Sequence, residues 1–97
     1  MTDAEILARV KSALLITTGH FDEVLRVHID DVKSYLKRAG VKESVINSKE
    51  SVGVILRGVS DLWNNGSGGV TFSPYFYDRA SQLALSGGGD DVQTGSN

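Results

Sequence analysis

The stretch that decides the fold is FDEVLRVHIDDVKSYLKRAG, residues 21–40. One set of its side chains recurs at the three- and four-residue intervals that place residues on a single face of a helix. This set comprises Phe21, Val24, Leu25, His28, Val32, Tyr35, Leu36 and Ala39. The remaining positions are mostly charged. The pattern therefore predicts an amphipathic helix over residues 21–39, closed by Gly40, that buries one face against other helices.

Helical spacing also extends to either side of this stretch. A first helix is predicted over residues 3–16, because Thr2 and Glu5 have the spacing of a capping box and Gly19 suits a left-handed cap. After a connector over 41–47, Asn47 or Ser48 is expected to cap a third helix that continues to residue 63. Gly53 and Gly58 lie inside that helix, where each costs about 1 kcal/mol relative to alanine. We expect them either to face solvent or to admit another backbone.

In the C-terminal third the composition becomes richer in glycine and polar residues. A Gly-rich break over 64–69 is followed by Ser73 and Pro74, which are typical of the start of a helix. From Ser86 the sequence SGGGDDVQTGSN has one apolar residue, so it predicts a flexible tail. The fold class is all-α: a small bundle of three long helices plus a short C-terminal helix. Residues 1–85 form the single domain that 97 residues allow, and residues 86–97 form the tail.

Composition excludes several functions. The chain has no cysteine, which excludes disulfides, thiol catalysis and cysteine zinc sites. The net charge is −2, and it argues against a general nucleic-acid binder, which needs a basic face. No apolar run has the length of a membrane span, and the first residues lack a cationic secretion signal. We expect a protein that works in a cytoplasm, away from membranes.

No catalytic, cofactor or metal site is predicted. His20 and His28 are eight residues apart, whereas metal ligands on one helix are typically three or four residues apart. The loop at 66–69 lacks the lysine and spacing of a phosphate-binding loop. A small helical DNA-binding regulator stays an alternative. Against it, the 41–47 connector is long for a helix-turn-helix, and Lys49 and Arg57 are balanced by acidic residues.

The aromatic residues cluster late in the chain. Five of the seven lie between Trp63 and Tyr77, around the single proline. Three consecutive aromatics on a helix cannot all face the core, so we expect part of this block to be buried and part to form an interface.

Two segments of this region resemble a known family. DLWNN at 61–65 and FSPYFYDRASQL at 72–83 resemble the end of the head–tail connector (adaptor) proteins of long-tailed bacteriophages. VKSYLKRAG at 32–40 resembles the second helix of that family, and the resemblance covers roughly residues 4–85. The Gly-rich loop and the two glycines of the third helix depart from the family pattern.

The resemblance implies a structural virion protein without enzymatic activity. Such subunits form a ring, typically a dodecamer, beneath the portal at the head–tail junction. The ring extends the DNA channel without binding DNA specifically, and it gives the next connector, stopper or tail protein a platform. The expected partners are therefore further copies of the chain, the portal protein and that downstream protein, after assembly in the host cytoplasm.

Two groups of residues are candidates for these contacts. The first is expected at, or supporting, a contact between subunits: Trp63, Phe72, Pro74, Tyr75, Phe76 and Arg79. Arg79 is the only cation after Arg57, so a carboxylate of a neighbour is its expected partner. The second group is expected to contact the portal and lies in the tail: Gly87, Asp90, Asp91, Val92 and Gln93.

Overall fold

The computed structural model describes residues 2–65 and 72–92, with side chains described for 2–64 and 72–85. The elements in chain order are α1 (Asp3–Ala13), α2 (Asp22–Arg38), α3 (Glu43–Ile46), a 3-10 turn η1 (Lys49–Ser51), α4 (Val52–Asn65) and α5 (Pro74–Val92). No strand occurs in these two ranges. The all-α prediction is therefore confirmed. None of the helices described has both the length and the apolar character needed to cross a membrane.

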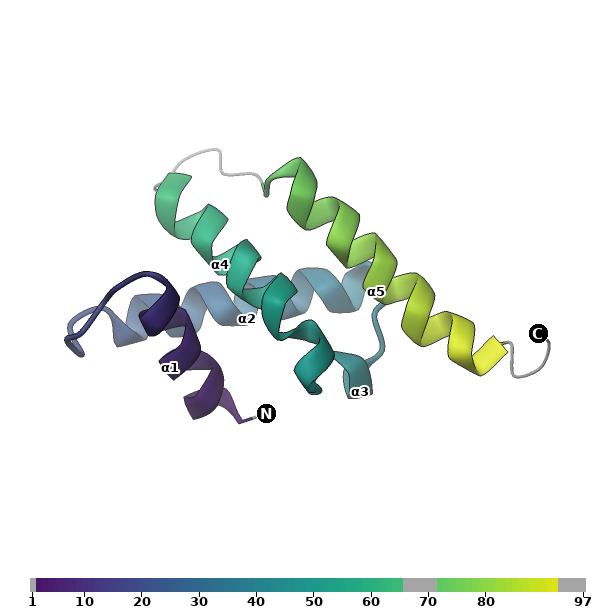
Figure 1. Cartoon of the computed structure of the whole chain (residues 1–97), viewed down its shortest axis with the longest axis horizontal. Helices are drawn as coiled ribbons and strands as arrows, with labels where there is room; N and C mark the ends of the chain where they lie inside the picture. The colour runs from purple at the N-terminus through teal and green to yellow at the C-terminus, as the bar shows by residue number, and fades with distance from the viewer. Residues whose placement is uncertain (1, 66–71, 93–97) are drawn as a thin grey trace.

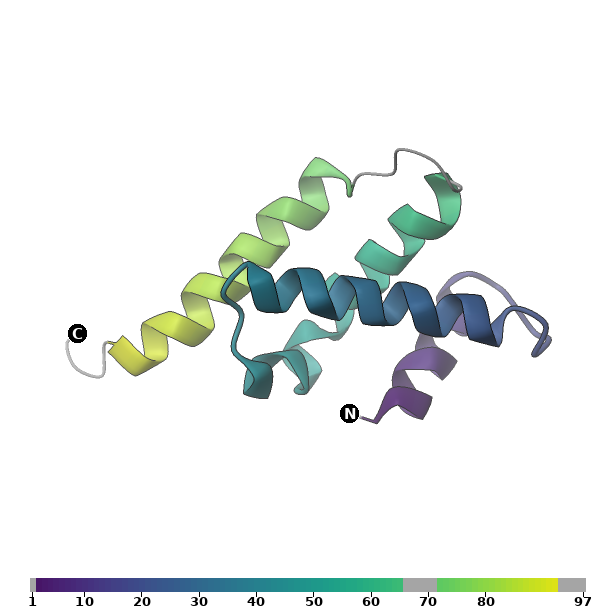
Figure 2. The same ribbon diagram turned by 180° about the vertical axis from the view of Figure 1, so that it is seen from behind.

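The helices form a thin, elongated body. α4 crosses in front of α2 in Figure 1, and the view from behind in Figure 2 places α2 nearest the viewer. α1 packs at one end of this crossing, and the second half of α5 extends past the other helices (Figures 1 and 2). The body measures 48 × 28 × 17 Å, and its radius of gyration is 14.0 Å. A compact domain of this length would have a radius of about 12.5 Å. α2 therefore forms one broad side of the body, and α4 with α5 forms the other.

One apolar core joins the long helices. α2 buries part of the predicted face, with Leu25, Val32 and Leu36 fully enclosed. Phe21, Val24 and Ala39 of that face are exposed, and Ile29, which the prediction left out, is buried in their place. α4 lies at the centre, because it contacts α1, α2 and α5. The remaining core residues come from all parts of the described chain: Ile6, Leu7, Val10, Ile29, Val41, Ile46, Val54, Ile55, Val59, Phe76, Ala80 and Leu83.

The two glycines of α4 have opposite surroundings. A Cβ atom placed on Gly58 would lie 2.7 Å from Cε1 of Phe76 and 2.8 Å from Cγ2 of Val32. Gly58 is therefore the point at which α4 comes close to both α2 and α5. A Cβ atom on Gly53 would have no neighbour within 4 Å. Gly53 faces solvent, which is one of the two uses expected for these glycines, whereas Gly58 admits side chains of α2 and α5 where another backbone was expected.

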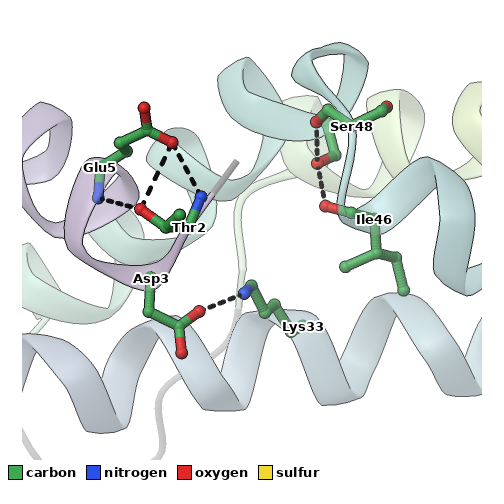
Figure 3. Close-up of polar contacts among 7 residues, drawn as sticks. Thr2, Asp3, Glu5, Lys33, Ile46 and Ser48 are labelled. Atoms are coloured by element: carbon green, nitrogen blue, oxygen red, sulfur yellow. Dashed lines mark hydrogen bonds and ion pairs between the residues drawn. The ribbon is translucent and has the colours of Figure 1, made fainter.

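The N-terminus of α1 has the predicted capping box (Figure 3). The Glu5 N–H donates to Thr2 Oγ1 at 3.1 Å, and the Thr2 N–H donates to Glu5 Oε1 at 2.8 Å. The hydrogen bond from the Thr2 backbone lowers the pKa of the Glu5 carboxyl, because it favours the charged form. Lys33 of α2 donates to Asp3 at 3.0 Å, which ties the start of α1 to α2 (Figure 3).

The predicted end of the first helix is wrong. α1 ends at Ala13, and the left-handed residue is Leu15, with φ of 61°, in place of Gly19. The Ile16 N–H donates to the Lys11 carbonyl at 2.8 Å and the Leu15 N–H to the Ser12 carbonyl at 3.2 Å. This hydrogen-bond pattern is a Schellman motif, in which backbone N–H groups just beyond the helix donate to its last carbonyls and so end it. Leu14 and Ile16 still pack on the core from outside the helix, which explains why apolar spacing alone extends the helix too far.

A short helix and a turn precede α4. α3 occupies much of the connector predicted over 41–47, and the 3-10 turn η1 follows it. Ser48 caps this turn, since Ser48 Oγ accepts from the Glu50 N–H at 3.2 Å. Ser51 is fully buried, and its hydroxyl lies 2.6 Å from the Ile46 carbonyl oxygen and 3.2 Å from that of Ser48, the two carbonyls drawn in Figure 3.

The C-terminal helix is longer than predicted. It begins as expected at Pro74, with Ser73 Oγ accepting from the Phe76 N–H at 3.2 Å. The prediction of a short helix ending near residue 85 is wrong, because α5 has 19 residues and ends at Val92. Once a helix is nucleated by packing, each added residue gains a hydrogen bond, so weak helix formers can continue it. Residues 93–97 of the predicted tail lie outside the described residues.

The glycines of α4 provide a matched pair of substitutions. Gly58→Ala should lower the free energy of unfolding by about 1–2 kcal/mol, because overpacking exceeds the gain in helix propensity. Gly53→Ala should raise it by up to about 1 kcal/mol, since only the propensity changes. Urea denaturation of both variants measures the difference. Equal effects of the two substitutions would contradict the close approach at Gly58.

Candidate functional site

Chemically reactive side chains are dispersed in the described parts of the chain. No three His, Asp or Glu residues gather there as a possible metal site. His20 is exposed and lies edge-on to Phe21, with ring centroids 5.4 Å apart, while His28 is half-buried. An open hollow of about 450 Å³ beside α2 and α3 is lined by charged residues that include Lys33, Lys37 and Glu43. These three charges are already paired, Lys33 with Asp3, and Lys37 with Glu43 at 3.7 Å, while Asp30 also lines the hollow. The hollow therefore offers no free charge from the three paired side chains to a ligand.

The predicted aromatic block divides into separate parts. Trp63 contacts Phe21 edge-on, with centroids 5.2 Å apart, at the start of α2. Phe72 and Phe76 stack at 4.2 Å and meet Tyr35 of α2 at 5.4 and 5.6 Å. Phe76 is fully buried and Phe72 is half-buried. These two phenylalanines can support an interface from within, whereas Trp63 is half-buried at a different place.

A polar clasp holds the first turn of α5 against α4. Asp61 is only 8% exposed, and its Oδ2 accepts from the Ser73 N–H at 2.9 Å. Arg57 Nε lies 3.3 Å from Asp61 Oδ1 and donates to Ser73 Oγ at 3.3 Å. The clasp therefore links three residues separated by up to 16 positions in the chain. It fixes where the side chains that follow Ser73 lie.

The clasp places two arginines beside one tyrosine. The guanidinium carbon of Arg57 lies 5.4 Å from the Tyr75 ring centroid, and that of Arg79 lies 6.0 Å from it. Tyr75 is 54% exposed, and both arginines are exposed as well. Within the described residues Arg79 has no ion-pair partner. We call Arg57, Tyr75 and Arg79 the arginine–tyrosine patch; it presents positive charge and an aromatic ring to solvent.

The predicted interface residues thus have different positions. Pro74, Tyr75 and Arg79 are exposed together on the first turns of α5. Arg57 and Asp61 were missed by the sequence-based prediction. Their spacing of four residues marks a helical ion pair, but the link to Ser73 crosses a loop and leaves no sequence signal. Of the tail candidates, Gly87, Asp90, Asp91 and Val92 belong to α5, and Gln93 is outside the described residues.

The clasp generates a stability prediction. Asp61→Ala should lower the free energy of unfolding by about 1–3 kcal/mol, because the partly buried Ser73 N–H and the Arg57 guanidinium lose their acceptor. Asp78→Ala on the exposed side of α5 is the control and should change it by less than about 0.5 kcal/mol. Thermal or urea unfolding compares the two. Similar losses in both variants would show that the clasp contributes nothing beyond an ordinary surface carboxylate.

Comparison with known proteins identifies a family. Residues 6–62 match the family described as phage connector protein. The match begins at the fourth residue of α1, covers α2 and α3, and stops three residues before the end of α4, so it ends before the segment 72–83. No curated protein and no solved structure matched the chain. Because the matched residues make up more than half of its length, the chain belongs to the phage connector protein family.

Proposed function

We propose that the chain is a head–tail connector (adaptor) subunit that assembles as a ring beneath the portal. In this position, at the head–tail junction of the virion, the ring extends the DNA channel and offers a platform to the next connector, stopper or tail protein. Membership of the phage connector family over α1–α4 is the observation that carries the proposal. Assembly in the host cytoplasm and a copy number near twelve belong to the same proposal.

The shape and charge of the subunit support this function. Ring contacts are heterologous, so a subunit needs two different surfaces on opposite sides. The thin body with α2 on one side and α4 and α5 on the other meets this requirement (Figures 1 and 2). The net charge of −2 suits a channel through which DNA slides without being gripped.

The end of α5 is the proposed contact with the portal. Among the side chains described in α5, Leu83 is the last buried one and Ala84 the last that packs on the core, while Leu85 is 75% exposed. Gly87–Gly89 lie inside the helix, where each glycine costs about 1 kcal/mol relative to alanine. A partner that binds this segment would offset that cost. The two charged residues after Leu83 are the acidic Asp90 and Asp91, which suit a basic portal surface.

Co-sedimentation of the purified chain with its portal ring, with negative-stain imaging of the pellet, tests the function. A collar of added density below the portal is expected, and its symmetry gives the copy number. A folded chain that leaves the portal bare would contradict the proposal. Salt-dependent binding to duplex DNA in that case would favour a DNA-binding regulator.

Removing residues 86–97 provides the matched variant. The truncated chain should keep the unfolding transition of the full chain, because the described core lies before residue 86. Its affinity for the portal should fall by at least about tenfold, a loss of about 1.4 kcal/mol. Two further variants divide the loss of portal affinity between length and charge. One lacks only residues 93–97, and the other has asparagine in place of Asp90 and Asp91. Unchanged portal affinity in the chain lacking 86–97 would exclude the tail as the docking segment.

A further inference from the structure

The outer side of α2 carries an acidic and apolar row that the core does not use. Glu23, Val27 and Asp31 are four residues apart, so they follow one another along the helix at intervals of about 6 Å. Val24 lies beside this row. Val24 is 45% exposed and Val27 is 52% exposed, while both carboxylates are exposed. We call Glu23, Val24, Val27 and Asp31 the α2 ridge.

The ridge has no partner in the subunit itself. Neither Glu23 nor Asp31 forms an ion pair within the described residues, where the lysines around them pair with Asp3, Asp22 and Glu43. Leu25, Ile29, Val32 and Leu36 take the other side of α2 into the core. The ridge therefore faces away from α4 and α5.

The arginine–tyrosine patch has the complementary pattern. It places two guanidinium groups 5.4 and 6.0 Å from a half-exposed ring, and the ridge places a carboxylate one helical turn before and one turn after the half-exposed Val27. The patch belongs to α4 and α5, which lie on the opposite broad side of the body from α2 (Figures 1 and 2). The two surfaces thus carry opposite charges beside exposed apolar area, and within one chain they belong to helices on opposite broad sides of the body.

We propose that the α2 ridge of one subunit packs on the arginine–tyrosine patch of a second copy of the chain. In this contact Tyr75 covers Val24 and Val27, and Arg79 pairs with Asp31. Arg57, which keeps its ion pair with Asp61 in its own subunit, lies beside Glu23. The inference rests on the proposed ring, since it names the two faces that meet between neighbours. Tyrosine and arginine are the residue types most often found to dominate interfaces, and pairing of opposite charges sets the register. A contact between different faces on opposite sides repeats from copy to copy, as a ring requires.

Charge reversal at Arg79 and Asp31 tests this contact. Arg79→Glu leaves the ridge intact and reverses the charge of the patch that faces Asp31, whereas Asp31→Lys leaves the patch intact and reverses the charge of the ridge that faces Arg79. Each variant alone should self-associate at least about tenfold more weakly than the natural chain, because like charges then face each other. An equal mixture of the two should recover assembly. In the mixture the reversed patch of one variant meets the reversed ridge of the other at one contact, and the native pair remains at the next. Sedimentation velocity at low salt measures the assemblies.

The controls separate the contact from general effects of charge. Lys49→Glu and Glu50→Lys make equivalent changes at exposed residues of η1, away from both surfaces, and should leave assembly unchanged. Circular dichroism of all variants verifies the fold. Weakening by both single reversals without recovery in the mixture, or equal weakening by the η1 controls, would overturn the proposed pairing.

Cysteine cross-linking gives an independent measurement at high protein concentration, with and without the portal. The chain contains no cysteine, so Val24→Cys on the ridge and Gln82→Cys, one turn beyond Arg79, introduce the only thiols. The double variant treated with a short bis-maleimide should give a ladder of dimers, trimers and larger products. Each single variant should give no ladder. The absence of a ladder from the double variant in both conditions would overturn the inference.

The results also distinguish this inference from the proposed function. A chain that forms a collar on the portal, yet shows neither recovery in the mixture nor a ladder, is a connector with other lateral contacts. A chain that shows both but leaves the portal bare retains the ridge-to-patch contact and loses the connector function.

Discussion

The close approach of α4 to α2 and α5 at Gly58 is the constraint on which the rest of the structure depends. A side chain as small as alanine would meet Val32 on one side and Phe76 on the other at less than 3 Å. With only a hydrogen atom at this point, Phe76 can enter the core fully and stack on Phe72. That packing brings the first turn of α5 within reach of Asp61 and Arg57. The exposed position of Tyr75 between two arginines therefore depends on the absence of a side chain at Gly58.

Patterns confined to one helix were predictable from the sequence. The stripe over 21–39 marks α2 to within one residue at each end, and Thr2 with Glu5 marks the start of α1. The ends of helices were less predictable. Leu15 adopts a left-handed conformation that propensity assigns to glycine, and α5 continues through a Gly-rich stretch that composition assigns to a tail. In both places hydrogen bonding between backbone groups outweighs the preference of the individual residue.

The candidate site was predictable only in part, for a related reason. The position of Tyr75 and Arg79 on one helix follows from their spacing of four residues. Arg57 reaches the same ring from α4 because Asp61 and Ser73 join the two helices, and that link depends on packing between distant segments. The same packing separates Trp63 from the other aromatics, although all of them lie close together in the sequence.

The connection between α1 and α2 disfavours domain swapping, in which two copies of a chain exchange a helix. Lys11 pairs with Asp22 across this connection at 2.8 Å, and both side chains are mostly shielded from solvent. The Schellman motif at Leu15 sets the direction in which the chain leaves α1, and a non-glycine residue there restricts the alternatives open to the unfolded chain. Domain swapping requires such a connection to straighten so that a helix can dock on another copy. Straightening here would break the ion pair and the two terminal hydrogen bonds together. α1 is therefore held on its own subunit, and in the proposed ring each copy would contribute surfaces that it has already folded.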